Sequence, residues 1–253
     1  SIIDPLLYYE NNVTGTLNLL STMLSFNVYN LIFSSSATVY GDTISPLNET
    51  DRIGNGITNP YGSTKYMIEY MLMDIAKSDI NFKITSLRYF NPVGAHKSGL
   101  IGENPLGRPN NLMPYIIRVA YHNNVKKTDS IYEQLNIYGN DYDTVDGTGV
   151  RDYIHVMDLA NAHLLAYKNL KQGYNVYNVG TGKGCSVNEL RNTFEAVNYV
   201  KIPHVIKDRR NGDIDTVVCN NTKITSELGW KPKCSIQDMC RDAWTYMLKS
   251  TRY

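Results

Sequence analysis

The sequence predicts an α/β protein organised around a parallel β-sheet. Residues 4–26 and 60–78 repeat apolar side chains at helical spacing, and residues 31–36 and 82–90 are short apolar runs typical of buried strands. Strands that follow one another through helices pair in parallel and bury their faces under those helices. With 253 residues, 42% of them hydrophobic, the chain can form one large domain or two closely joined lobes.

Composition narrows the class of protein. The net charge of +1 and the pI near 7.6 argue against an electrostatic nucleic-acid binder and give no reason to expect membrane-surface binding. There is no run of about 18 apolar residues and no secretory signal pattern, so we expect no transmembrane helix and no secretion. The four cysteines form no CxxC pair and show no zinc spacing, so we expect reduced thiols, no metal and a cytoplasmic location.

Capping residues define the first helix and the strand after it. Asp4 suits an N-cap and Pro5 the first helical position, so a helix should reach about Phe26. The following strand ends in Ser34–Ser36, and we expect the first two of these serines to bond backbone groups. Residues 42–58 are polar, contain proline and glycine, and predict a loop.

The second helix opens with an unusual pair of residues. Pro60 suits its first position, and its apolar stripe, extended backwards, passes through Lys65 and Tyr61. A buried, unpaired lysine is costly, so it needs a partner. The next strand is broken at Asn91-Pro92, and in parallel sheets ligands bind beyond the carboxyl ends of the strands. We therefore expect Tyr61, Lys65 and the serine run at one edge of the sheet.

The second half of the chain begins with a segment of different composition. Residues 93–109 are rich in glycine and proline and predict a long irregular segment, followed by a helix from Pro114 through Ala120. Residues 121–134 are polar without periodicity and predict a solvent-exposed loop. The other expected elements are strands at residues 136–139, 154–156, 176–180 and 204–206, a helix with Ala160, Leu164 and Tyr167 on one face, helices capped by Ser186/Glu189 and Ser235/Asp238, and a helix from Thr222 to Leu228.

A tyrosine with a lysine one turn later can move a proton. Free tyrosine titrates near pH ~10, and a cation held close favours the phenolate and lowers the pKa. The phenolate of Tyr61 could then take a proton from an alcohol or sugar hydroxyl, with a strand-end serine donating to the same oxygen. The structural alternative is a core tyrosine beside a lysine whose amine reaches solvent. The residues by themselves leave both interpretations open.

Short motifs along the chain resemble a known family. Residues 33–41 (FSSSATVYG), 59–65 (NPYGSTK) and 87–96 (LRYFNPVGAH) resemble the extended short-chain dehydrogenase/reductases. The runs at 102–105, 109–115, 138–142 and 146–156 narrow the resemblance to the UDP-hexose 4-epimerases, in the right order along nearly the whole chain. The resemblance implies a Rossmann-like doubly wound parallel sheet, here without its N-terminal strands, and a smaller α/β substrate-binding domain.

The resemblance also implies a reaction. UDP-glucose and UDP-galactose would be interconverted: Tyr61 would remove the proton of the sugar 4-hydroxyl, and NAD would take the hydride from C4. After the 4-keto sugar turns over, the hydride would return to its other face. Lys65 would hold the nicotinamide ribose and depress the pKa of Tyr61, and Ser36 would bridge Tyr61 and the sugar 4-oxygen.

Ligand contacts follow from the same resemblance. For the cofactor NAD they are Asn11, Ser36, Tyr61, Lys65 and Phe90. For the UDP-hexose they are Ser36, Thr38, Tyr89, Asn91, Asn111, Leu112, Tyr138, Arg151, Arg210, Asp213 and Val217. The alternative for the two arginines is an ion pair with a neighbouring acid, and for Tyr138 a core position. Val217 matches the position that limits room for an N-acetyl group, so UDP-GlcNAc and UDP-GalNAc are further expected substrates.

The chain also departs from the family pattern. The implied NAD domain is residues 1–95 with 152–183, and the implied UDP-sugar domain is residues 96–151 with 184–253. No Gly-rich turn that could cradle the pyrophosphate precedes them, and Gly180–Gly184 lies too late to replace it. We therefore expect a fragment or a truncated homologue that, alone, holds NAD poorly and is poorly active. Residues 121–134 look inserted, and Asn211 stands where the family usually has glutamate; we expect little effect of either on catalysis.

Two rival functions and one partner complete the expectations. Dehydratases of this fold carry an Asp-Glu pair where this chain has Ala37 and Thr38, which favours epimerisation over a 4,6-dehydratase or decarboxylase. A non-catalytic homologue is disfavoured by the intact set of Ser36, Tyr61 and Lys65. The resemblance suggests a homodimer formed through the helices at 4–26 and 61–78.

Overall fold

The computed structural model describes residues 1–210 and 212–250. Contacts divide the chain into two compact units. Unit 1 comprises Ser1–Phe90, Asn161–Gly182 and Cys219–Lys231, and unit 2 comprises Asn91–Ala160, Lys183–Val218 and the described residues from Pro232 onward. The functional assignment of the predicted domains to NAD and to UDP-sugar stays a prediction.

The sheet of unit 1 is parallel, as the sequence predicts. Its strands β1 (Asn30–Ser36), β2 (Lys83–Tyr89) and β6 (Gly173–Val179) are ordered β1-β2-β6. Ser36 pairs with Tyr89, and Tyr89 pairs with Val179, so the carboxyl ends of the strands are in register. The predicted hydroxyl-bearing edge of the sheet therefore forms.

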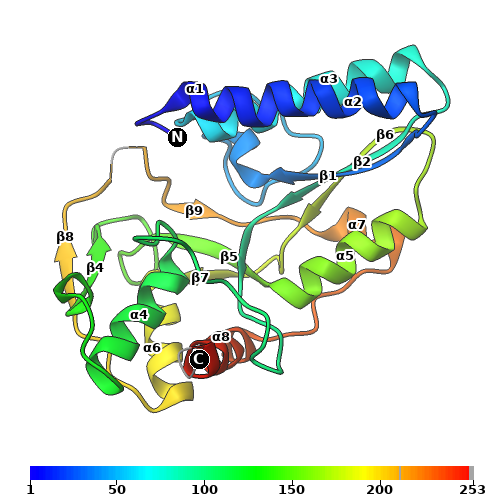
Figure 1. Cartoon of the computed structure of the whole chain (residues 1–253). Coiled ribbons are helices and arrows are strands. Elements are labelled where there is room, and N and C mark those ends of the chain that lie inside the picture. The colour runs from blue at the N-terminus through cyan, green and yellow to red at the C-terminus, as the bar shows by residue number, and fades with distance from the viewer. Residues whose placement is uncertain (211, 251–253) are drawn as a thin grey trace. The chain divides into compact units, whose positions relative to one another are not determined.

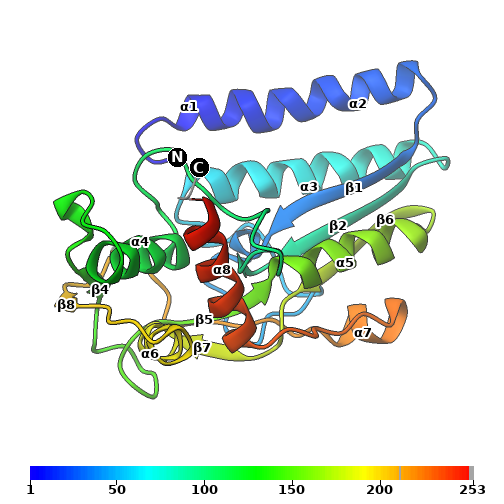
Figure 2. The same ribbon diagram turned by 60° about the horizontal axis from the view of Figure 1, so that its bottom comes forward.

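Helices cover both faces of this sheet (Figures 1 and 2). The N-terminal helix consists of α1 (Pro5–Tyr8), a π-helical segment (Tyr9–Thr14) and α2 (Gly15–Ser25). It lies beside α3 (Pro60–Ser78) on one face, where Leu20, Ile68 and Leu72 are buried over the sheet. The part of α5 (Val156–Lys168) that belongs to unit 1 lies on the other face with α7 (Thr222–Leu228).

The expected apolar face of α5 is not its buried face. Leu164 and Tyr167 are 49% and 62% exposed, whereas Ala162 and Ala166 are buried. The helix carries one apolar stripe of large side chains and another of alanines. The alanine stripe is the buried one, and its small side chains permit a close approach to the sheet. Spacing identified the helix but did not identify the side that packs.

The described part of unit 2 combines small sheets with helices α4 (Leu112–Asn124), α6 (Val187–Asn198) and α8 (Ile236–Ser250) and the start of α5. One sheet contains β3 (Asn91–Val93), β5 (Val150–His155), β7 (Gly184–Ser186) and β9 (Thr216–Val217), and β4 (Leu135–Tyr138) pairs with β8 (His204–Lys207). The predicted capping boxes form: Glu189 N–H donates to Ser186 Oγ, and Asp238 N–H donates to Ser235 Oγ.

The segment 121–134 differs from the expected exposed loop. α4 continues to Asn124, and Tyr121, His122 and Tyr132 are buried in unit 2. The reason is local hydrogen bonding: the backbone N–H of Thr128 donates to His122 Nδ1, and Asn123 Nδ2 donates to Glu133 O. Polar side chains here fold the segment onto its own helix, which sequence periodicity does not reveal.

Among residues 1–210 and 212–250, no helix combines the length and the apolar character needed to cross a bilayer.

Candidate active site

The start of α3 brings a phenol and an ammonium to the strand ends of unit 1. Asn59 caps the helix by accepting the Gly62 N–H at 2.9 Å, and Pro60 occupies the first helical position. Gly62 lets this first turn approach closely, because a Cβ there would lie 2.8 Å from Ile57 Cγ2 and 3.3 Å from Thr38 Cβ. The missing side chain thus seats Tyr61 beside the turn that follows Ser36.

Lys65 is half-buried and has a specific partner. Its Nζ donates to the carbonyl oxygen of Ser34 at 2.8 Å and lies 4.9 Å from the Phe33 ring centroid and 5.6 Å from that of Tyr61. Burial lowers the pKa of Lys65. This is the partner that a lysine on the inner face requires, so the amine is not simply a solvent-directed group.

The pKa of Tyr61 is raised in this structure, opposite to the expected lowering. Burial is the largest cause, and the neighbouring Tyr89 adds to it, while a hydrogen bond with Ser36 works against it. The Lys65 ammonium is engaged with a carbonyl oxygen 31 residues away in sequence rather than with the phenol oxygen. Lys65 alone therefore does not make Tyr61 a base near neutral pH.

The other residues predicted in unit 1 lie on the same elements. Ser36 Oγ accepts from the backbone N–H of Thr38 at 3.2 Å and from its hydroxyl at 3.0 Å, in the 3₁₀ turn Ala37–Tyr40. Tyr89 ends β2, and the backbone N–H of buried Phe90 donates to Val179 O. Asn11 is exposed in the π-helical segment, where its side chain donates to Asn12.

Ser34 and Ser35 were expected to bond backbone groups, but their hydroxyls bond side chains instead. Ser34 Oγ shares a hydrogen bond of 3.0 Å with His163 Nε2, and Ser35 Oγ donates to Glu69. Alternation along β1 explains the split, because successive side chains face opposite sides of the sheet. Glu69 and its partner Arg88 are buried residues that sequence reasoning missed.

A second cluster of predicted residues lines one cavity in unit 2. The cavity has a volume of about 600 Å³, within the usual range for small-molecule sites. The predicted residues that line it are Asn91, Asn111, Leu112, Tyr138, Arg151, Arg210 and Asp213. They come from five separate stretches of sequence, so the fold gathers them.

Cations and aromatic rings share this cavity. The Arg210 guanidinium lies 4.0 Å from the Tyr138 ring centroid, and Arg151 Nη2 lies 3.9 Å from Asp213 Oδ1. Among the described residues Arg210 forms no ion pair, whereas Arg209 pairs with Asp141 at 2.7 Å. The alternative role, an ion pair with an acidic residue, therefore applies in part to Arg151 but not to Arg210. It is Arg209 that forms such a pair.

Val217 lies on β9, pairs with Arg151 in the sheet and is not among the residues that line the cavity. Tyr142 lines it and was missed: it is 5% exposed, and its hydroxyl has no partner in the described part of the chain. No local pattern marks Tyr142 as buried, because it lies within the loop between β4 and β5. Asn211 lies outside the described residues.

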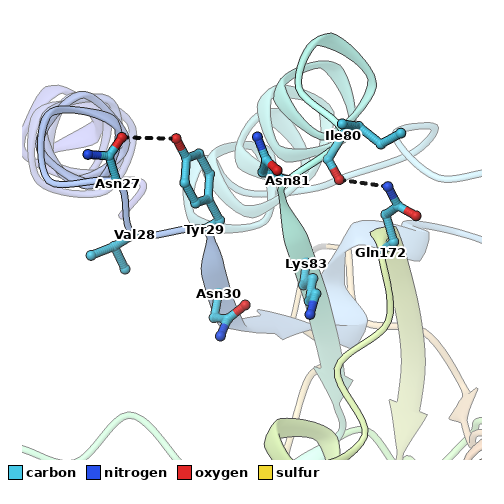
Figure 3. Close-up of a pocket in the computed structure, with 8 residues that line it drawn as sticks. All are labelled: Asn27, Val28, Tyr29, Asn30, Ile80, Asn81, Lys83 and Gln172. Carbon is cyan, nitrogen blue, oxygen red and sulfur yellow. Dashed lines mark hydrogen bonds between the residues drawn. The ribbon is translucent and has the colours of Figure 1, made fainter.

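A shallower hollow in unit 1 contains none of the predicted residues. It is lined by Asn27–Asn30, Ile80, Asn81, Lys83 and Gln172 at the amino ends of the strands (Figure 3). Tyr29 OH donates to Asn27 and Gln172 Nε2 donates to Ile80 O, so two of its polar groups are already paired.

Family comparison agrees with the motifs. The model of the "NAD dependent epimerase/dehydratase family" matches residues 1–180. The chain belongs to this family. Similar proteins include UDP-glucose 4-epimerases. That of Pasteurella multocida is 49% identical over 100% of this chain and 73% of its own length. That of Homo sapiens is 47% identical over 97% of this chain and 69% of its own length.

Solved structures of the family show the same fold. The UDP-glucose 4-epimerase of Bifidobacterium longum, in complex with NAD+ and UDP, has a TM-score of 0.91 and 45% identity, over 99% of this chain and 73% of its own. That of Stenotrophomonas maltophila, with bound NAD and formylated UDP-arabinopyranose, has a TM-score of 0.91 and 44% identity, over 98% and 72%. The predicted Rossmann-like α/β class is therefore confirmed.

The donor groups of this epimerase/dehydratase chain fit one end of the cofactor. The Lys65 ammonium carries three N–H donors, and one of them donates to Ser34 O. Its remaining donors, together with the Tyr61 hydroxyl, suit the hydroxyls of a nicotinamide ribose. Gly180–Gly184 leads into α6, whose first turn would have to supply the N–H groups that bind a phosphate. Ser186 and Glu189 of the helix itself cap that turn, so the described residues show no phosphate cradle there.

Proposed function

We propose that this protein interconverts UDP-glucose and UDP-galactose by NAD-dependent epimerisation at C4. The observation that carries the proposal is the cavity of unit 2. Seven residues that the family resemblance implies as UDP-hexose contacts line it together, although they are distant in sequence: Asn91, Asn111, Leu112, Tyr138, Arg151, Arg210 and Asp213. Its arginines suit a diphosphate, since guanidinium groups bind such oxygens in bidentate fashion. Tyr138 offers a ring face for a pyrimidine, and Asp213 an acceptor for ribose hydroxyls.

In unit 1 we assign the chemistry to Tyr61, Ser36 and Lys65. Tyr61 takes the proton of the sugar 4-hydroxyl and returns it at the end, while Ser36 hydrogen-bonds the same oxygen. Lys65 orients the nicotinamide ribose, with Asn11 and Phe90 as further cofactor contacts. When bound, NAD would supply the hydride acceptor for C4 of the sugar and the donor for its return to the opposite face. Thr38 and Tyr89 contact the hexose from unit 1.

The direction of the Tyr61 pKa adds a requirement to this assignment. Burial raises that pKa, so the chain's own groups keep the phenol protonated near neutral pH. A phenolate then needs a further positive charge at the site, and the cationic ring of NAD is the group with that charge. Proton removal should therefore depend on the cofactor.

Product analysis tests the proposal. Purified chain is incubated with UDP-glucose, with and without added NAD, and galactose is measured after acid hydrolysis of the nucleotide sugar. Galactose formed only with NAD, or with NAD released from the protein on denaturation, supports the proposal. A 4-keto-6-deoxy or decarboxylated product would assign the protein to the rival reactions. UDP binding without turnover, even at saturating NAD, would assign it to a non-catalytic homologue.

N-acetylated substrates are a second candidate. Val217 does not line the cavity, so the support for these substrates is a structural relative: the UDP-Glc/GlcNAc 4-epimerase of Campylobacter jejuni has a TM-score of 0.79 and 36% identity. UDP-GlcNAc and UDP-glucose are assayed side by side. Turnover of UDP-glucose alone would remove UDP-GlcNAc and UDP-GalNAc from the substrates.

A homodimer and a cytoplasmic location complete the proposal. Leu6, Leu17 and Met67 are exposed on α1, α2 and α3, and helices with exposed apolar side chains can pack as a bundle between two copies. The four cysteines are free thiols, which suits a reducing compartment. The mass in solution, measured by sedimentation equilibrium, tests the dimer.

A further inference from the structure

Directly behind the strand ends of unit 1 lies a buried ion pair. Glu69 on α3 is 0% exposed, and Arg88 on β2 is 3% exposed. Arg88 Nη2 donates to Glu69 Oε2 at 2.6 Å, and Arg88 Nε donates to both carboxylate oxygens at 3.0 and 3.1 Å. A bidentate pair of this kind holds its two side chains in one relative orientation.

Hydrogen bonds extend the pair to two further strands. Ser35 Oγ on β1 donates to Glu69, and Tyr174 OH on β6 donates to Glu69 Oε2 at 3.0 Å. Arg88 Nη1 donates to the Tyr40 hydroxyl at 3.0 Å. A single carboxylate of α3 thus contacts every strand of the sheet of unit 1.

The sequence positions of these contacts connect them to the proposed catalytic residues. Glu69 follows Lys65 by one helical turn and Tyr61 by two. Its partner Ser35 is adjacent to Ser36, and Arg88 is adjacent to Tyr89. Lys65 Nζ donates to Ser34 O at 2.8 Å, so neighbouring residues of β1 bind neighbouring turns of α3.

We propose that Glu69 is a positioning residue, whose carboxylate fixes α3 against the strand ends and so sets Tyr61 and Lys65 relative to Ser36. This inference rests on the proposed function. Fold stability alone does not account for the pair, since well-packed apolar side chains of similar volume often match or exceed a buried ion pair in stability. What the charged pair adds is a fixed geometry, and small misplacements of reacting groups lower rates strongly.

Two mild variants test the inference, because Glu69→Gln would leave Arg88 buried without its counter-charge and could unfold the chain. Tyr174→Phe removes one anchor of Glu69, and Ser35→Ala removes another. The matched control is Tyr177→Phe, which deletes a similar bond on the same strand, from Tyr177 OH to Glu227 at 2.8 Å, outside the network. We expect kcat to fall about tenfold in the two test variants, with an unchanged KM for UDP-glucose, and no change of either constant in the control.

A second measurement is independent of turnover. In chain labelled with carbon-13 at lysine Cε, the Lys65 resonance is identified by its loss in Lys65→Arg, and it is titrated in each variant. The ionisable groups around Lys65 are Tyr61 and Glu69 on α3, and His163 across Ser34. Looser seating of α3 admits water, so the Lys65 pKa should rise toward its ordinary value in Tyr174→Phe and Ser35→Ala but not in Tyr177→Phe.

The two measurements separate the inference from the proposed function. If the wild-type chain does not epimerise UDP-glucose, the proposed function fails, and the lysine titration still decides whether Glu69 positions α3. Lys65 titrations that coincide in all variants overturn the inference. Equal losses of kcat in Tyr174→Phe and Tyr177→Phe overturn it as well, since they would indicate a general effect of destabilising β6.

Discussion

In unit 1 the pair Glu69–Arg88 is 0% and 3% exposed, whereas in unit 2 the pair Arg151–Asp213 is 22% and 38% exposed. The first pair is separated by 2.6 Å and is surrounded by further donors. The second is separated by 3.9 Å and lines an open cavity. Buried charges satisfy one another and fix a geometry, while half-exposed charges keep hydrogen-bonding capacity for a ligand. In the function that we propose, the first pair supports the reaction edge of unit 1 and the second lines the binding pocket of unit 2.

The largest expected effect separates catalysis in unit 1 from binding in unit 2. Tyr61→Phe removes the proton acceptor, so turnover of UDP-glucose should fall by about 10²- to 10⁴-fold. The affinity of the Tyr61→Phe variant for UDP should stay unchanged, because the cavity proposed to bind UDP is lined only by residues of unit 2. Turnover is measured with NAD added, and UDP binding by calorimetry. Tyr66→Phe on the same helix is the control, and wild-type turnover in Tyr61→Phe would refute the assignment.

Alkaline pH should weaken the buried network of unit 1. Burial raises the pKa of Tyr40 to about 12 from 10.0, despite its contacts with Arg88. Between these values the folded state keeps a proton that the unfolded state has lost, so the free energy of unfolding falls as pH rises. Full stability is present below pH 10, and on the order of 2 to 3 kcal/mol is lost for this group as the pH rises through 12. Urea denaturation at pH 9, 10 and 11 should show a shallower decline in Tyr40→Phe; parallel declines would contradict the prediction.

Local signals explain what could be predicted from the sequence. The bounds of α3, the capping of α6 and α8, and the parallel order of β1 and β2 follow from spacing and capping residues close in sequence. Family motifs supplied the cavity residues, which no local pattern brings together. Glu69 on α3 and Arg88 on β2 were missed because a charged side chain predicts exposure to solvent, and only tertiary contact shows that each buries the other.

Two errors have the same physical origin. The segment 121–134 was expected to be exposed because it is polar, yet His122 and Tyr132 are buried with hydrogen-bond partners inside unit 2. The Tyr61 pKa was expected to fall because a lysine is near, yet burial outweighs a cation engaged elsewhere. In both cases the type of residue was known from sequence, but its hydrogen-bond partner was not.

A smaller effect tests the binding role of unit 2. Arg210→Ala removes a cation that lines the cavity and forms no ion pair among the described residues, so UDP affinity should fall about 10- to 100-fold. The rate at saturating UDP-glucose should change little, since Arg210 does not belong to unit 1. Arg241→Ala, which loses the same charge on α8 beside Asp238, is the control. A lower kcat with unchanged affinity would reverse the roles of the two units.

The smallest expected effect concerns the seating of α3. Gly62→Ala places a methyl group 2.8 Å from Ile57 Cγ2, so Ile57 and the helix start must move apart, and the free energy of unfolding should fall by about 1 to 2 kcal/mol. Gly15→Ala is the matched control. It lies in α2, where an added Cβ would meet no atom within 4 Å beyond its chain neighbours and the helix backbone, and alanine should raise that free energy by about 0.5 to 1 kcal/mol. Turnover should fall in Gly62→Ala with unchanged UDP affinity, because the shifted turn carries Tyr61 away from Ser36. If Gly62→Ala keeps full turnover despite its lower stability, the seating of this turn does not limit the reaction, and the geometry of unit 1 tolerates more movement than its buried ion pair suggests.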